Sequence, residues 1–241
     1  MKILSIGNSF SQDATRYLHG IAKSGQVDMK VVNLYIGGCS LYRHYVNIHN
    51  DAKDYGFEFN GCDTGIKVSV REALKSDVWD IVTLQQVSHE SFDYNTYQPY
   101  LNALADYVYI HAPKARIMLH QTWAYEEGSD RLIKELGFTN RRAMFDRIKE
   151  AYQKASNELG GVEIIPCGEA FENLIENGIQ NIHRDTFHAS LGVGRYTLGC
   201  VFYEKLTGNS CIGNTFRDFD EFISEKDIRL AQESAHKASN M

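Results

Sequence analysis

Five short apolar runs, each rich in β-branched or aromatic residues, alternate along this chain with segments of helical spacing. The runs cover residues 3–6, 30–36, 79–84, 115–120 and 162–166. The helical segments cover residues 12–24, 70–76, 97–111, 141–159, 191–206 and 225–237. Such alternation is typical of a parallel sheet with helices on both faces. The sequence therefore predicts a three-layer α/β/α sandwich with a parallel sheet of about five strands.

Segment 50–68 interrupts this pattern, because its residues alternate in polarity around an Asn60-Gly61 pair. That combination predicts a small β-hairpin. The chain shows no repeat, low-complexity tract or linker, and 241 residues with 43% hydrophobic content are enough for one substantial core. We therefore expect a single domain over residues 1–241.

The charge and cysteine content narrow the class of protein. A net charge of -6 and the lack of a Lys/Arg run argue against a nucleic acid or an anionic membrane as a partner. The five cysteines are odd in number and include no Cys-x-x-Cys, which indicates mostly reduced thiols. No signal peptide or membrane-length apolar run is recognisable, so a cytoplasmic location is the default expectation, although a trimmed secreted form would read the same.

Polar or conformationally special residues follow every predicted strand. The strands lead into Gly7-Asn8-Ser9, Gly37-Gly38-Cys39-Ser40, Gln85-Gln86-Val87-Ser88-His89-Glu90, His120-Gln121-Thr122-Trp123 and Pro166-Cys167-Gly168. Because the carboxyl ends of parallel strands meet at one edge of a sheet, where open α/β folds bind ligands, we expect these groups to converge.

Ser9 lies between the first strand and a helical segment, and Asp185 stands three residues before His188. A serine nucleophile needs a base and a group that orients the base, which His188 and Asp185 supply. His89 and His120 also follow strands but lack an acidic residue three positions earlier.

Three groups are candidate donors to an oxyanion: the N–H groups of Ser9 and Gly38 and the side-chain amide of Gln85. The alternative for the last two is structural, with Gly37-Gly38 forming a turn and Gln85 capping a strand.

These motifs resemble those of the SGNH (GDSL-like) hydrolases. Gly7-Asn8-Ser9-Phe10-Ser11 is similar to the Gly-Asp-Ser-x-Ser block, Gly38-Cys39-Ser40 to the glycine block, and Asp185-Thr186-Phe187-His188 to the Asp-x-x-His block. The resemblance implies a flavodoxin-like sheet and hydrolysis by Ser9, His188 and Asp185.

The third block departs from that family, which usually has Gly-x-Asn-Asp where this chain has Leu84-Gln85-Gln86-Val87. Related carbohydrate acetylesterases have Gln-Gly-Glu there. By that analogy Gln85 replaces the Asn amide, with Gln86 in reserve for that role. Gln86 is otherwise a candidate for substrate binding. Asn8 in place of the family's Asp is a milder departure.

The sequence thus predicts a serine esterase for small acyl esters, with O-acetyl groups on a carbohydrate favoured. Trp123, Tyr125 and Tyr42 are candidates for stacking on a sugar, although ordinary packing explains them equally well.

A zinc site built from His89, Glu90, His120, Asp185 and His188 is an alternative chemistry, but it lacks a recognisable ligand spacing. We expect no metal and no cofactor. The alternative class is a non-catalytic glycan-binding module, and the acyl group, the alcohol and the oligomeric state stay open.

Overall fold

A computed structural model describes residues 1–240 as a seven-stranded sheet with helices on both faces. The strand order is β4-β3-β2-β1-β5-β6-β7. Five strands run parallel: β1 (Lys2–Gly7), β2 (Lys30–Tyr35), β5 (Ile81–Leu84), β6 (Arg116–His120) and β7 (Ile164–Ile165). The strands β3 (Tyr55–Phe59) and β4 (Cys62–Val68) form the antiparallel hairpin predicted around Asn60-Gly61. The predicted three-layer α/β fold is confirmed.

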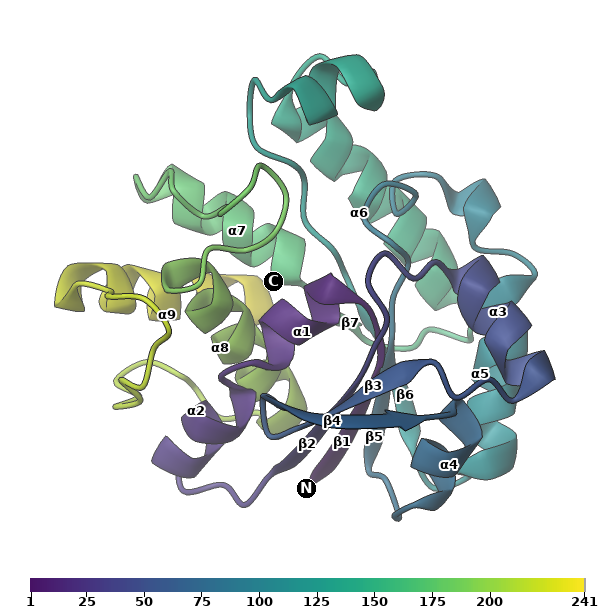
Figure 1. Ribbon diagram of the computed structural model, residues 1–241. Helices are drawn as coiled ribbons and strands as arrows, with labels where there is room; N and C mark the ends of the chain where they lie inside the picture. Colours follow the sequence, from purple (N-terminus) through teal and green to yellow (C-terminus); the bar gives the residue numbers. More distant parts are fainter. Residues whose placement is uncertain (241) are drawn as a thin grey trace.

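The helices divide between the two faces of the sheet (Figure 1). One face carries α3 (Leu41–Asn50), α4 (Val70–Lys75), α5 (Tyr100–His111) and α6 (Arg141–Glu158). The other carries α1 (Ser9–Thr15), α2 (Leu18–Ser24), α7 (Cys167–Glu176), α8 (Val193–Thr207) and α9 (Glu225–Ser239). A 3₁₀ turn, η1 (Tyr94–Thr96), and a π-helical turn, η2 (Arg131–Glu135), lie in the connections. Within residues 1–240, we find no helix with both the length and the apolar character needed to cross a membrane.

Two helical segments differ from the sequence-based prediction. The helix expected over 12–24 is two helices, because Arg16 and Tyr17 at the break bind distant parts of the chain: Arg16 bonds to Gly61 O and Tyr17 to Leu191 O. The sequence did not predict helix α3, because this segment has few strong helix formers. Its one local signal is Ser40, whose hydroxyl caps the helix by accepting from the Arg43 N–H.

The central strand β1 ends level with its two parallel neighbours. Ile6 pairs in register with Leu34 of β2 and Leu84 of β5, so the residues that follow the three strands meet. Gly7 permits the close packing there, because a Cβ on it would lie 2.5 Å from Ser11 Oγ. The turn that carries Ser9 is therefore seated directly on the edge of the sheet.

Candidate active site

Three side chains form a hydrogen-bonded series across the first and last quarters of the chain. Ser9 Oγ lies 2.7 Å from Nε2 of His188, and Nδ1 of His188 lies 2.7 Å from Oδ2 of Asp185. Ser9 is the first residue of α1, after the cap residue Asn8, whose side chain accepts from the Phe10 N–H. The structure thus brings together the three residues that the sequence singled out as nucleophile, base and orienting acid.

Asp185 fixes the conformation of the loop as well as the orientation of the imidazole. Its Oδ1 accepts a hydrogen bond from the backbone N–H of His188 while Oδ2 faces the ring. Partial burial raises the pKa of Asp185, but the hydrogen bonds from the His188 ring and backbone outweigh it, and the pKa lies below its usual value. An ionised Asp185 keeps Nδ1 protonated and leaves the Nε2 lone pair directed at Ser9.

The loop that carries His188 is anchored to α1 by a buried ion-pair network. The fully buried carboxylate of Asp13 accepts from Nη1 of Arg184 and Nε of Arg195, each over 2.9 Å, and from the Ala189 N–H over 3.1 Å. Ala189 and Arg184 flank the loop segment that contains Asp185 and His188. Because Asp13 and Ser9 share one short helix, this network fixes the distance between nucleophile and base.

A cavity of about 330 Å³ opens beside Ser9. Its walls come from the tips of β1, β2 and β5, from the segment after β6 and from the His188 loop. The lining residues are Asn8, Ser9, Gln12, Tyr35, Gly37, Gly38, Val87, Ser88, His89, Tyr125, Arg131, Arg184, Phe187 and His188. Polar and apolar side chains both line the cavity, and it is large enough for a small organic ester.

Two backbone N–H groups at the cavity, those of Ser9 and Gly38, have no acceptor within residues 1–240. Gly38 has a φ of +62°, a left-handed conformation that favours glycine, whereas a Cβ there would meet nothing within 4 Å. The Asn8 side chain ties the two turns together, because its Nδ2 donates to Cys39 O over 3.0 Å. Free N–H groups held in this way are suited to bind an oxygen that acquires negative charge.

The structure corrects the expectation for Gln85. Its amide nitrogen donates to Oδ1 of Asn8 over 2.9 Å, and its Oε1 lies 2.8 Å from Nδ1 of the buried His120. Gln85 is buried and does not line the cavity beside Ser9. Its side chain turns inward because it forms the link between two buried polar groups, so it is placed to support Asn8 rather than to touch an oxyanion.

Gln86 is also directed away from the cavity. Its Oε1 accepts from the N–H groups of Leu41 and Val87, and its Nε2 donates to the backbone and hydroxyl oxygens of Thr96. This side chain joins the tip of β5 to the start of α3 and to η1. A role in substrate binding, which the sequence left open for Gln86, does not fit this position.

The three aromatic residues expected to stack on a sugar differ in their position relative to the cavity. Trp123 is fully buried, stacks on Phe10 with ring centres 4.0 Å apart and donates to Phe187 O, so it has no free face for a sugar. Tyr42 is exposed on α3 and packs edge-on against Tyr100, outside the set of residues that line the cavity. Tyr125 is buried but lines the cavity, and its hydroxyl lies 2.9 Å from Ser88 Oγ.

His120 and His89, the other two histidines that follow strands, differ in their burial. His120 is fully buried, and burial lowers its pKa to about 3, so it is neutral at physiological pH. His89 lies at the mouth of the cavity and is exposed. Neither is within hydrogen-bonding distance of Ser9 among the contacts of residues 1–240. In the same part of the chain, no group of three or more His, Cys, Asp or Glu side chains has the arrangement of a metal site.

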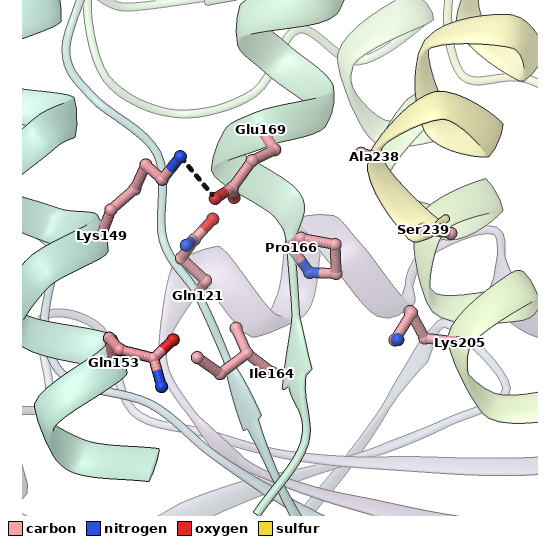
Figure 2. Close-up of a pocket in the computed structure, with 9 residues that line it drawn as sticks. All are labelled: Gln121, Lys149, Gln153, Ile164, Pro166, Glu169, Lys205, Ala238 and Ser239. Carbon is pink, nitrogen blue, oxygen red and sulfur yellow. Dashed lines mark ion pairs between the residues drawn. The ribbon is translucent and has the colours of Figure 1, made fainter. Parts of the chain in front are cut away.

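Further cavities lie elsewhere on the molecule, and two of them are comparable to this one or larger. One, of about 270 Å³, sits beside the edge strand β7 and contains the ion pair of Lys149 with Glu169, 3.5 Å apart (Figure 2). A larger one, of about 610 Å³, lies behind the His188 loop between residues 178–193 and 221–227. Neither cavity has a serine hydroxyl bonded to a histidine among its lining residues. Chemistry rather than size therefore identifies the cavity beside Ser9 as the candidate active site.

Sequence reasoning did not single out several residues of this cavity. Arg131 lies in η2, and its guanidinium carbon stands 4.0 Å from the centre of the Phe187 ring. Gln12, Tyr35, Ser88 and Phe187 also line the cavity. Phe187 sits inside the Asp-x-x-His motif and Tyr35 at a strand end, so their positions were visible in the pattern. Arg131 had no such signal, because it lies in a connection between predicted elements.

Comparison with known proteins places the fold and the family. Among proteins of curated function, no sequence matches this chain. A protein from Slackia heliotrinireducens that is described as a proposed SGNH hydrolase has 24% identity and a TM-score of 0.61 to this chain. The match covers 85% of this chain and 97% of that one. The acetylxylan esterase Axe2 from Geobacillus stearothermophilus has 17% identity and a TM-score of 0.58, over 86% and 94%. These similarities show that the chain has the fold of SGNH hydrolases.

A nearer similarity is to a DUF4886 family protein from Bacteroides uniformis, whose crystal structure has a TM-score of 0.90 to this chain at 35% identity. The match covers 99% of this chain and 94% of that one. The model of the family described as "Domain of unknown function (DUF4886)" matches residues 2–238. The chain therefore belongs to the DUF4886 family.

Proposed function

We propose that this protein is a serine esterase that hydrolyses small acyl esters, with Ser9 as nucleophile, His188 as general base and Asp185 as the acid that orients His188. The observation that carries the proposal is the continuous hydrogen-bonded series from Ser9 Oγ through His188 to Asp185, with both contacts at 2.7 Å. A serine beside a histidine without an orienting acid would be a common surface contact. All three in order, next to a cavity, are what acyl transfer requires.

The reaction follows from these positions. Ser9 Oγ attacks the ester carbonyl carbon while Nε2 of His188 takes its proton. The tetrahedral intermediate then collapses, the alcohol leaves with that proton, and the acyl group stays on Ser9. A water molecule, deprotonated by His188, attacks the acyl-enzyme and releases the acid, which restores the Ser9 hydroxyl. Asp185 stabilises the imidazolium in both halves of the cycle.

The negative oxygen of each tetrahedral intermediate is assigned to the free N–H groups of Ser9 and Gly38. Removing one oxyanion donor of this kind typically costs ~3–4 kcal/mol of barrier, so two backbone donors supply a large part of the catalysis. Gln85 is excluded from this set by its bonds to Asn8 and His120. Its contribution is to hold Asn8, whose other amide bond joins the Ser9 and Gly38 turns.

The size of the cavity and the similarity of fold to acetylxylan esterases support an acetyl or comparably short acyl group, with a sugar as a candidate alcohol. The stacking surface for such a sugar would be Tyr35, which lines the cavity, rather than Trp123 or Tyr42.

Labelling with a fluorophosphonate, together with the hydrolysis of p-nitrophenyl acetate, tests the proposal. The wild-type protein should be labelled at Ser9 and should hydrolyse acetate faster than long-chain esters. Ser9→Ala should abolish labelling, and Ser9→Ala, His188→Ala and the double variant should lose nearly the same fraction of the rate, because the groups act as a unit. A protein that binds acetylated sugars but is neither labelled nor active would be a glycan-binding module instead.

A further inference from the structure

The charged residues that line the cavity beside Ser9 differ in sign from the chain as a whole. Although the chain carries a net charge of -6, no aspartate or glutamate is among the residues that line the cavity. Two arginines are, Arg131 and Arg184. A cationic side chain at a cavity without acidic lining residues favours anions there over cations.

The two arginines are not equivalent. Arg184 forms an ion pair with the buried Asp13. Both carboxylate oxygens of Asp13 lie 2.9 Å from Nη1 of Arg184. Arg131 faces no buried acid. Its one acidic partner within residues 1–240 is Glu135, one turn along η2, with Nε and Oε2 3.4 Å apart and both side chains substantially exposed. Such an exposed pair is weak and exchanges readily with another anion.

The position of Arg131 relative to His188 is defined by the Phe187 ring. The guanidinium carbon of Arg131 stands 4.0 Å from the Phe187 ring centre, and that ring centre stands 3.9 Å from the centre of the His188 imidazole. Phe187 is thus in contact with both the guanidinium of Arg131 and the imidazole of the general base. Contact with the ring restricts the movement of the guanidinium, which lowers the entropy cost of binding a planar anion.

The side of the substrate that meets Arg131 follows from the chemistry. His188 must return its proton to the leaving oxygen, so the alcohol half of the ester lies on the His188 side of Ser9. The carbonyl oxygen lies on the other side, toward the N–H groups of Ser9 and Gly38. Because Phe187 contacts both His188 and Arg131, an anionic group on the alcohol half is the one placed to reach Arg131.

We propose that the substrate is an acyl ester of an alcohol that carries an anionic group, such as the carboxylate of a sugar acid, and that Arg131 binds this group. The proposal rests on the esterase function proposed above and specifies its substrate class. An aryl carboxylate serves as the probe, because it presents the same planar anion to the guanidinium.

The experiment compares 4-acetoxybenzoate, with an anionic leaving group, and 4-acetoxybenzamide, with a neutral one, each rate normalised to hydroxide hydrolysis. We expect wild-type kcat/KM to favour the anionic ester by about tenfold, since a charge-assisted hydrogen bond is worth about that factor or more. Added salt should reduce the preference. Monophenyl succinate against phenyl butyrate, which moves the charge to the acyl half, should show no such preference.

Arg131→Gln should abolish the preference, and Arg131→Lys should retain part of it. The matched control is Lys134→Gln, on the same turn: Lys134 is exposed, pairs with Asp130 and does not line the cavity, so its loss should leave the preference intact. Thermal unfolding of each variant checks that η2 still packs. Equal preference in wild type and Arg131→Gln, or a preference that follows the acyl half, would overturn the proposal.

A direct binding measurement separates this inference from the esterase function. Calorimetry on Ser9→Ala should show that 4-hydroxybenzoate binds more tightly than 4-hydroxybenzamide, and that Arg131→Gln removes the difference. If neither ester is hydrolysed but this difference is present, the esterase function fails and the anion site stands. If the esters are hydrolysed through Ser9 with no difference in binding or rate, the anion site fails alone.

Discussion

Gln85 donates a hydrogen bond from its side-chain amide to Oδ1 of Asn8, over 2.9 Å, and both side chains are buried. Asn8 passes this support on, because its own amide nitrogen donates to Cys39 O beside Gly38. A pair of amides thus connects the tips of three neighbouring strands, β5, β1 and β2. Gln85 therefore supports the turn that carries Ser9 from the core side.

The first prediction concerns Gln85 as a positioning residue. Gln85→Ala should lower kcat about 10- to 100-fold with little change in KM, since a shift of the Ser9 turn by a fraction of an ångström misaligns the donors. Asn8→Ala should cause a similar loss, and the double variant should be little worse than either, because both break one connection. Additive losses would indicate instead that Gln85 acts directly on the substrate. Gln86→Ala, which removes a buried amide from a different network, is the control and should keep its kcat.

Asn8→Asp tests the connection from the other side, with the residue type that the SGNH family usually has there. An ionised aspartate accepts hydrogen bonds but cannot donate one to Cys39 O, so two acceptors would face each other in a buried site. We expect the variant to lose about 2–3 kcal/mol of unfolding free energy at pH 8. Urea unfolding should show a smaller loss near pH 4, where the introduced carboxyl group, once protonated, can donate again. A variant as stable as wild type at pH 8 would argue against this account of Asn8.

The third prediction concerns Asp185 and pH. Its pKa is lowered in the folded protein by the bonds from His188, so its contribution to stability is present above the ordinary aspartate value of 3.8 and is lost as pH falls through the folded value. Asp185 should therefore stay ionised over the pH range in which the enzyme works. On the acid side of its pH profile, kcat/KM should fall with the slope expected when one group becomes protonated. Asp185→Asn should lower kcat by about 10³–10⁴ while leaving the fold intact. A steeper acid limb would mean that Asp185 titrates together with the base.

Glu169, in the cavity beside β7, gives a stability prediction with the opposite sign. Burial raises its pKa, the nearby Lys149 only partly opposes this, and its Oε2 has no hydrogen-bond partner within residues 1–240. The folded state therefore holds this proton more tightly than the unfolded state, and the unfolding free energy falls as pH rises from 4.5 through the folded value. Urea unfolding across that range should show Glu169→Gln gaining on wild type as pH rises. Glu163→Gln, which removes an exposed carboxylate paired with Arg116, should show no comparable trend.

The sequence pointed to Ser9, Asp185 and His188 through features that are local in the chain. Asp185 and His188 are three positions apart, and Ser9 directly follows a buried strand, so local patterns suffice to place them. Gln85 and Trp123 could not be placed in this way. Whether a side chain at a strand tip faces the cavity or the core depends on what lies behind it: His120 and Asn8 for Gln85, and Phe10 and Phe187 O for Trp123.

The fold was predictable for a similar reason, because alternating strands and helices specify a parallel sheet whatever the details of the loops. The failures fall where distant contacts override local preference. The break between α1 and α2 is set by partners of Arg16 and Tyr17 that are 45 and 174 positions away. Arg131 lies in a connection, and its place over Phe187 depends on the packing of η2 rather than on any motif.

The Asp13 network has a consequence for the order in which the molecule is assembled during translation. Asp13 is made early, but its partners Arg184 and Arg195 follow it by 171 and 182 positions. Until they leave the ribosome, a helix that carries the nucleophile also carries a carboxylate whose burial has no compensation. Helix α1 should therefore pack only loosely on the sheet at that stage, although most of the strands have already been translated. A nascent chain should thus acquire its native α1 packing and a reactive Ser9 in one late step, when α8 packs against α1.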